Sequence, residues 1–140
     1  MSTPEGTAPT SVTYRTRIGW SDTDASGHYH NSTVIRLVEA AEALLVRERG
    51  ITDWFGVTPR VRTEIDFAGR LWFDQPVSCE LVLERLGTSS ATFTFTVTGE
   101  AVGDRPGGRA ASGRVVVVYS PDTAGRSAPW PDAWRAALTD

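Results

Sequence analysis

The sequence contains one cysteine and lacks any long apolar run. Cys79 alone cannot form a disulfide within the chain, and no apolar segment follows the first residues, so we expect a reducing compartment, the cytoplasm. No apolar stretch approaches the roughly 20 residues that span a bilayer. We therefore expect no membrane partner.

Clustered positive charge is also lacking. The chain of 140 residues carries 14 Lys and Arg against 17 Asp and Glu, a formal net charge of -3, and its basic residues are scattered singly. Because nucleic-acid-binding surfaces depend on clustered positive charge, we expect no nucleic-acid partner. A small molecule or an acyl-carrier protein is the expected partner instead.

What the sequence does have is one concentrated polar segment, Asp22–Asn31, with two carboxylates, a glycine, two imidazoles and an asparagine. The segment runs into the only long helical pattern of the chain, so its polar groups are expected over the start of a helix. Backbone N–H groups there lack partners and carry partial positive charge. Such a place suits an anion, or a carbonyl oxygen that becomes negative during a reaction, with a carboxylate nearby to attack or to activate water.

Apolar residues recur at helical spacing after this segment and predict a helix over roughly residues 32–49. Asn31 is expected as its N-cap and Gly50 as its C′ residue. Ile35 and Val46 form a second apolar stripe beside the main one. We therefore expect the helix to be wrapped on most sides, by a curved sheet and by a partner subunit.

Alternation of apolar and polar residues predicts five strands, over residues 12–20, 57–67, 77–84, 91–98 and a last run ending in 114–119. One strand, a long helix and four more strands predict an α+β fold in which an antiparallel sheet curls round the helix. The expected organisation is a flexible arm over residues 1–11, a single domain over residues 12–120 and a tail over residues 121–140 with a short helix that begins near Pro131.

The polar segment also resembles a known motif. It reads Trp20-Ser-Asp22-Thr-Asp24-Ala-Ser-Gly27-His28-Tyr-His30-Asn31, and Glu39 follows in the helix. An aromatic residue, Asp-x-Asp, a glycine, a short polar stretch and a helix with a glutamate resemble the hotdog-fold acyl-CoA thioesterases of the 4-hydroxybenzoyl-CoA thioesterase type. The order of strands and helix matches that family over residues 12–120, and the segment 67–77 resembles its link between the second and third strands.

The resemblance implies a hotdog subunit, with about five strands curved around one long central helix, that forms a homodimer or homotetramer with acyl sites at the subunit interface. It implies that Asp24 is the catalytic carboxylate and that the backbone N–H of Asn31 polarises the thioester carbonyl. Val34 stands where relatives often carry an aromatic residue, and His30 where they commonly carry Tyr or Asn. The acyl group therefore cannot be carried over from any relative.

Several of these residues also have a structural interpretation. Asp24 is either catalytic or a turn former, and Asp22 is expected to accept hydrogen bonds from loop N–H groups. His28 either orients water or the thioester, or braces the loop. Carboxylates and imidazoles also suit a metal ion, but the spacing of this set matches no familiar motif, so we expect no metal.

Three further residues are candidates for substrate binding: Gly27, His30 and Glu39. Glu39 lies more than two turns into the expected helix. Its alternative role is to tie down a loop or the neighbouring subunit.

The expected function is hydrolysis of an acyl thioester carried on coenzyme A or on the phosphopantetheine of an acyl-carrier protein. Asp24 acts either as nucleophile through a mixed anhydride or as general base on water. No cofactor is required beyond the thiol carrier of the substrate. Two alternatives are a hotdog dehydratase that acts on a 3-hydroxyacyl thioester through His28 or His30, and a non-catalytic module that binds acyl-CoA.

Overall fold

A five-stranded antiparallel sheet forms the frame of the computed structural model, which describes residues 9–139. The strands lie in the order β1-β3-β4-β5-β2. Their bounds are β1 Ser11–Arg17, β2 Arg60–Phe67, β3 Pro76–Leu86, β4 Ser90–Gly99 and β5 Gly108–Val118.

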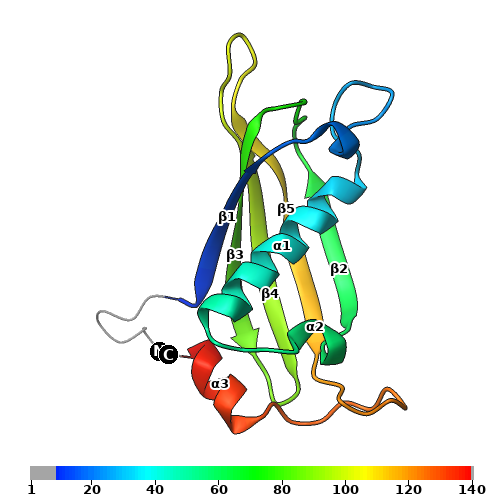
Figure 1. Cartoon of the computed structure of the whole chain (residues 1–140), viewed down its shortest axis with the longest axis vertical. Helices are drawn as coiled ribbons and strands as arrows, with labels where there is room; N and C mark the ends of the chain where they lie inside the picture. Colours follow the sequence, from blue (N-terminus) through cyan, green and yellow to red (C-terminus); the bar gives the residue numbers. More distant parts are fainter. Residues whose placement is uncertain (1–8, 140) are drawn as a thin grey trace.

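One long helix, α1 (Ser32–Glu48), lies diagonally across one face of the sheet, and the sheet curves round it (Figure 1). Two short helices, α2 (Trp54–Val57) and α3 (Asp132–Thr139), lie near the C-terminal end of α1 (Figure 1). The predicted α+β fold, with a sheet wrapped around a central helix, is confirmed.

The strands bury alternate residues, as the sequence pattern predicts. In β4 every second side chain is buried and those between are half-buried, so one face of this central strand packs on α1. β5 lies between β4 and β2, and its valines Val115 and Val117 are buried while Val116 and Val118 are half-buried. A run of valines with little polar character therefore occupies an inner strand.

Only one face of α1 is buried within the chain. Its buried residues are Thr33, Val34, Leu37, Val38, Ala41, Glu42, Leu45 and Val46. The predicted second stripe is wrong, because Val46 is 5% exposed and belongs to the core whereas Ile35 is 43% exposed. The outward face of the helix has no cover within residues 9–139.

The C-terminus of α1 ends as predicted, at Gly50. This glycine has a φ of 72°, its N–H donates to Arg47 O at 3.1 Å, and the N–H of Ile51 donates to Val46 O at 2.9 Å. The two hydrogen bonds satisfy carbonyl groups at the helix end, in the pattern of a Schellman motif.

Two predicted strand ends give way to local turns. The first strand stops at Arg17, and Trp20–Asp22 forms a short 3₁₀ helix, η1, because Trp20 O accepts hydrogen bonds from both the N–H and the hydroxyl group of Thr23. Helix α2 occupies the predicted start of the second strand, and the Thr58 hydroxyl donates to Trp54 O at 2.5 Å.

The two ends of the described chain meet. The Thr10 hydroxyl donates to Leu138 O at 2.6 Å, and both residues are buried. Most of the predicted arm, residues 1–8, lies outside the described residues, whereas Ser11 belongs to β1. Trp130, just before α3, stacks on Trp54 with a ring-centroid distance of 5.3 Å, so α3 closes one end of the core. Among the helices of residues 9–139, none has the length and apolar character needed to cross a bilayer.

Candidate active site

The polar segment before α1 folds back on itself as a closed loop. Thr23 and Tyr29 form an antiparallel bridge, the Asp24 N–H donates to His28 O at 3.2 Å, and the Gly27 N–H donates to Asp24 O at 3.0 Å. Gly27 has a φ of 86°, a conformation that glycine adopts without strain. The loop lies at the N-terminal end of α1, at the opposite end of the molecule from α3 (Figure 1).

Asp24 is exposed at the turn of this loop, and only one of its carboxylate oxygens is engaged. Oδ1 accepts a hydrogen bond from the Ser26 N–H at 2.8 Å and another from the Ser26 hydroxyl. Together, the Ser26 hydroxyl and N–H hold the pKa of Asp24 below its usual 3.8. Oδ2 has no hydrogen-bond donor within residues 9–139 and remains free for chemistry.

An open hollow of about 340 Å³ adjoins Asp24. Its aromatic walls are Trp20 and Phe73, whose rings meet edge to face with centroids 5.6 Å apart. Trp20 is 77% exposed, so its indole stands out into solvent beside the carboxylate. Gly27 also lines this hollow, whereas His28, His30 and Asn31 do not.

Asp22, the first carboxylate of the pair, holds the loop together. Its Oδ2 accepts from the Gly19 N–H at 2.8 Å, and its Oδ1 pairs with Arg36 Nη2 at 2.8 Å. Its backbone carbonyl accepts from the His30 N–H at 2.7 Å and from the Thr33 hydroxyl at 2.8 Å. The two carboxylates thus have different environments, one tied to its neighbours and one open.

The start of α1 differs from its predicted form. Asn31 takes the N-cap position, as predicted, but it has helical backbone angles and its side chain makes no capping hydrogen bond. His30 supplies the capping contacts instead, because its Nδ1 accepts from the Ser32 N–H at 3.1 Å and its carbonyl accepts from the Thr33 N–H at 2.9 Å. The Asn31 N–H has no acceptor in the described part of the chain.

His28 lies between the loop and the connection from β2 to β3. It forms a backbone bridge with Trp72, and the two rings meet edge to face at 5.6 Å between centroids. Its Nδ1 is buried without a hydrogen-bond partner in the described chain. This position suits a brace for the loop, and the orienting role expected from the sequence stays a prediction.

Glu39 is exposed on the outward face of α1. Seven residues beyond Ser32, it is about 10 Å along the helix axis from the loop, so within one chain it is not brought to the hollow beside Asp24. The buried carboxylate of this helix is Glu42, which accepts from Trp54 Nε1 at 2.5 Å and pairs with Arg60 Nη2 at 2.7 Å. Burial raises the pKa of Glu42, and the Arg60 guanidinium opposes that rise. Sequence reasoning missed Glu42, although its spacing of four from Val38 places it in the buried stripe.

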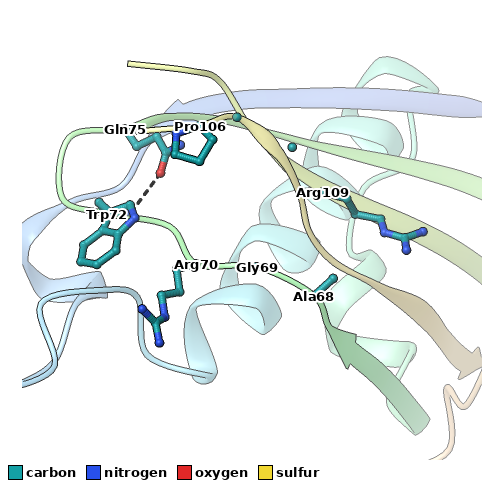
Figure 2. Close-up of a pocket in the computed structure, with 9 residues that line it drawn as sticks. Ala68, Gly69, Arg70, Trp72, Gln75, Pro106 and Arg109 are labelled. Carbon is teal, nitrogen blue, oxygen red and sulfur yellow. Dashed lines mark hydrogen bonds between the residues drawn. The ribbon is translucent and has the colours of Figure 1, made fainter. Parts of the chain in front are cut away.

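A second hollow of about 380 Å³ is lined in part by Trp72 and lies between the β2–β3 connection and the start of β5 (Figure 2). Gln75 fixes its inner wall: Oε1 accepts from the Trp72 N–H at 3.0 Å and Nε2 donates to Glu100 O at 2.8 Å. The remaining lining residues are Ala68, Gly69, Arg70, Pro106, Gly107, Gly108 and Arg109. Sequence reasoning missed this hollow, because its walls come from the β2–β3 connection and from the segment around the start of β5, which are far apart along the chain.

Metal-ligating side chains do not converge in the described chain. Within residues 9–139 no group of three or more His, Cys, Asp or Glu side chains is placed to hold a metal ion. The Asp-x-Asp and His-x-His residues of the loop face different neighbours: Ser26 for Asp24, Arg36 for Asp22, Trp72 for His28 and Ser32 for His30.

Solved structures share this fold. The 4-hydroxybenzoyl-CoA thioesterase from Pseudomonas sp. strain CBS-3 matches with a TM-score of 0.82 at 19% identity, over 93% of this chain and 99% of that one. The 1,4-dihydroxy-2-naphthoyl-CoA thioesterase from Synechocystis matches with a TM-score of 0.80 at 15% identity, over 93% and 96%. A predicted thioesterase from Bacillus stearothermophilus matches with a TM-score of 0.78 at 26% identity, over 91% and 93%.

Sequence comparison reaches the same family. Among curated protein sequences none matches significantly, but the profile of the thioesterase-like superfamily matches residues 18–138, from the end of β1 into α3. The hotdog fold and the thioesterase assignment expected from the polar segment are confirmed. The chain therefore belongs to the thioesterase-like superfamily.

Proposed function

We propose that this protein hydrolyses an acyl thioester with Asp24 as the reacting carboxylate and the Asn31 N–H as the donor to the thioester carbonyl. The observation that carries the proposal is the difference between the two loop carboxylates. Asp22 is engaged through both oxygens, whereas Asp24 presents a free Oδ2 at a hollow with aromatic walls. A low pKa keeps Asp24 ionised near neutral pH, as either a nucleophile or a general base requires.

The helix start supplies the second part of the apparatus. Attack on a thioester places negative charge on the carbonyl oxygen, and an unpaired N–H at a helix N-terminus stabilises that charge. The Asn31 N–H lacks an acceptor in the described chain and is free for this purpose. His30 contributes by holding the first turn of α1, and Gly27 by giving the loop its turn.

Other nucleophiles and the dehydratase reaction find less support. Burial raises the pKa of the Cys79 thiol to about 12, and its side chain is fully buried, so it does not react near neutral pH.

A dehydratase needs a histidine paired with a carboxylate. The Nδ1 of His30 is bonded to Ser32, and that of His28 has no partner within residues 9–139.

The apparatus needs no metal and no organic cofactor, because a carboxylate and an N–H donor suffice for thioester hydrolysis. The substrate is an acyl group on coenzyme A or on a carrier protein, consistent with the acyl-CoA thioesterases that share the fold. We place the reaction in the cytoplasm, since the chain has a single cysteine and no means of forming an internal disulfide.

The active unit in this proposal is a homodimer or a tetramer built from it. Strand β2 is an edge of the sheet, and Val61 and Phe67 on it are 59% and 49% exposed. Ile35 on the outward face of α1 adds a further exposed apolar side chain. A second subunit that covers these residues would close the acyl site and would supply its own Glu39 to that site.

The test is a pair of matched substitutions in the loop, Asp24→Asn and Asp22→Asn, assayed by thiol release from a panel of acyl-CoA thioesters. We expect Asp24→Asn to lower kcat by about 10²–10⁴-fold, since an amide is neither a base nor a nucleophile near neutral pH. Folding should be retained, because Asp24 is exposed.

Asp22→Asn serves as the control and should lower stability more than rate, because it weakens the contacts with Gly19 and Arg36. Equal losses of kcat in the two variants, at unchanged stability, would contradict the roles assigned to the pair. Absence of thiol release from every thioester by the unmodified protein would contradict hydrolysis itself and favour a binding module.

A further inference from the structure

Arg36 is a cation at the end of α1 where the helix dipole favours anions. It lies in the second turn, and because helical side chains lean towards the N-terminus, its guanidinium reaches back over the first turn. The partial positive charge of the N–H groups at the helix start opposes a cation there. Asp22 compensates, because its Oδ1 lies 2.8 Å from Arg36 Nη2. Helix formation alone therefore does not explain an arginine at this position.

The Arg36 guanidinium also contacts both hydroxyl groups of the first turn. Nη1 donates to Ser32 Oγ at 3.0 Å, and Nη2 donates to Thr33 Oγ1 at 3.1 Å. A guanidinium only donates, so each hydroxyl accepts from Arg36 and keeps its single hydrogen for a different partner. The Thr33 hydroxyl gives its hydrogen to Asp22 O at 2.8 Å. Arg36 thus orients two hydroxyl groups at once.

The other hydroxyl, that of Ser32, gives its hydrogen to His30. Ser32 Oγ lies 2.9 Å from His30 Nδ1, and the Ser32 N–H donates to the same nitrogen at 3.1 Å. An N–H donates to Nδ1 only if this nitrogen carries no proton, so the hydroxyl is the donor in its contact as well. His30 is therefore held in the neutral form that carries its proton on Nε2. All these contacts fit one arrangement of hydrogen atoms.

This arrangement decides which N–H group at the start of α1 remains free. His30 occupies the Ser32 N–H through Nδ1 and the Thr33 N–H through its carbonyl, at 2.9 Å. The Asn31 N–H, immediately before them in the chain, has no acceptor within residues 9–139. His30 therefore engages two donors and leaves the third for a substrate oxygen. That selection holds only while the His30 ring stays in place.

We propose that Arg36 is a positioning residue for thioester hydrolysis. Through Ser32 it fixes the neutral His30 that caps α1, and through Asp22 it ties the loop of the reacting carboxylate to the same turn. The inference rests on the proposed function, in which that carboxylate and the Asn31 N–H act on one carbonyl group. Arg36 contacts neither of them and acts by holding the loop and the helix start in register.

The kinetic test compares Arg36→Ala with Arg47→Ala, at an exposed arginine near the other end of α1. We expect Arg36→Ala to lower kcat for thiol release by about 10-fold with KM little changed, because a displaced helix cap weakens a contact made in the transition state. Arg47→Ala should keep the unmodified kcat. Urea titration of both variants separates loss of rate from loss of folded protein. An unaltered kcat in Arg36→Ala would overturn the proposal.

His30 provides the conservative variant. Asparagine offers an acceptor oxygen in place of Nδ1 and is itself a good N-cap, so His30→Asn should retain kcat within about 3-fold, whereas His30→Ala should lose about 10-fold. His30→Ala combined with Arg36→Ala should give little further loss, because both substitutions interrupt one chain of contacts. Losses that multiply in the double variant would overturn the proposal.

Nitrogen NMR of the imidazoles provides a readout that does not depend on turnover. The chain has two histidines, and the signal lost in His30→Asn assigns them. At about pH 8, where histidine is ordinarily neutral, His30 should carry its proton on Nε2 in the unmodified protein, and Arg36→Ala should show a larger share of the other tautomer. A proton on Nδ1 in the unmodified protein, or identical spectra in the two proteins, would overturn the proposal. This spectrum decides the inference even if no thioester is hydrolysed, so its failure and failure of the proposed function are distinguishable.

Discussion

Ser26 controls the ionisation of the carboxylate that we assign to catalysis. Its hydroxyl and its backbone N–H both donate to Asp24 Oδ1, and hydrogen bonds to the charged form lower a carboxyl pKa. The hydroxyl is the largest cause of the low pKa of Asp24. The reactive form of Asp24 therefore persists to a lower pH than that of an ordinary aspartate.

This relation predicts the effect of Ser26→Ala on the pH dependence of hydrolysis. Loss of the hydroxyl donor destabilises ionised Asp24 and raises its pKa, so the acid limb of kcat/KM should move to higher pH, by an amount read from the pH–rate profile. Ser21→Ala, at an exposed serine just before the polar segment, should leave the limb in place. An acid limb unmoved by Ser26→Ala would mean that a group other than Asp24 titrates there.

At the scale of residues, the sequence identified the functional segment but did not predict the role of each side chain within it. The polar segment was identified from its residue types, but the capping role passed from Asn31 to His30. That change depends on the hydrogen bond from the His30 N–H to Asp22 O. A backbone contact of this kind cannot be predicted from residue types. Glu42 was missed because a glutamate among apolar residues is explained only by its partners, Trp54 and Arg60, which lie 12 and 18 residues away.

At the scale of elements, Glu42 joins three of them: α1, which carries it, α2 through Trp54, and β2 through Arg60. Removing a buried carboxylate leaves its partners without an acceptor, at a cost of about 3–5 kcal/mol. We therefore expect Glu42→Ala to lower the free energy of unfolding by about that amount in urea titrations. Glu39→Ala, three residues away on the exposed face of α1, should change it by less than about 0.5 kcal/mol. Similar effects of the two substitutions would refute the structural role of the Glu42 contacts.

The elements themselves were largely predictable, and their ends were not. Alternation along Ala91–Thr98 predicted β4 because one face of that strand packs on α1, and Gly50 predicted the end of the helix because few other residues adopt its φ of 72°. The strand predicted through Trp20 stopped at Arg17 instead. Alternation persists there, but Trp20 O turns to Thr23, and local hydrogen bonds decided the outcome.

At the scale of the whole molecule, the fold brings together residues that are far apart along the sequence. Arg70, Arg105 and Arg109 look isolated in the sequence, and the expectation of no clustered positive charge followed from that spacing. The fold brings Arg70 and Arg109 to one hollow, and it places Arg105 over the ring of Trp72, which also lines that hollow. Only the pairing of strands across the sheet reveals this cluster, and a pattern read along the chain does not contain it.

The exposed edge of β2 predicts the state of assembly. If a second subunit covers it, Val61→Asp should reduce the molar mass in light scattering from that of a dimer or tetramer towards that of one chain, because a charge cannot be buried there without a partner. Val102→Asp, at a comparably exposed valine in the β4–β5 connection, should leave the mass unaltered. A monomeric unmodified protein at micromolar concentration would refute the assembly, and with it a site completed by the partner.

The contact between Thr10 and Leu138 has a practical consequence for immobilising the protein on a solid support. These residues lie at one end of the molecule and the loop around Asp24 lies at the other (Figure 1). A protein coupled to a bead or sensor chip through the beginning of β1 or the end of α3 would therefore present the hollow beside Asp24 to the flowing solution. Immobilisation through either of these ends should give the same orientation, with the reacting carboxylate turned away from the support.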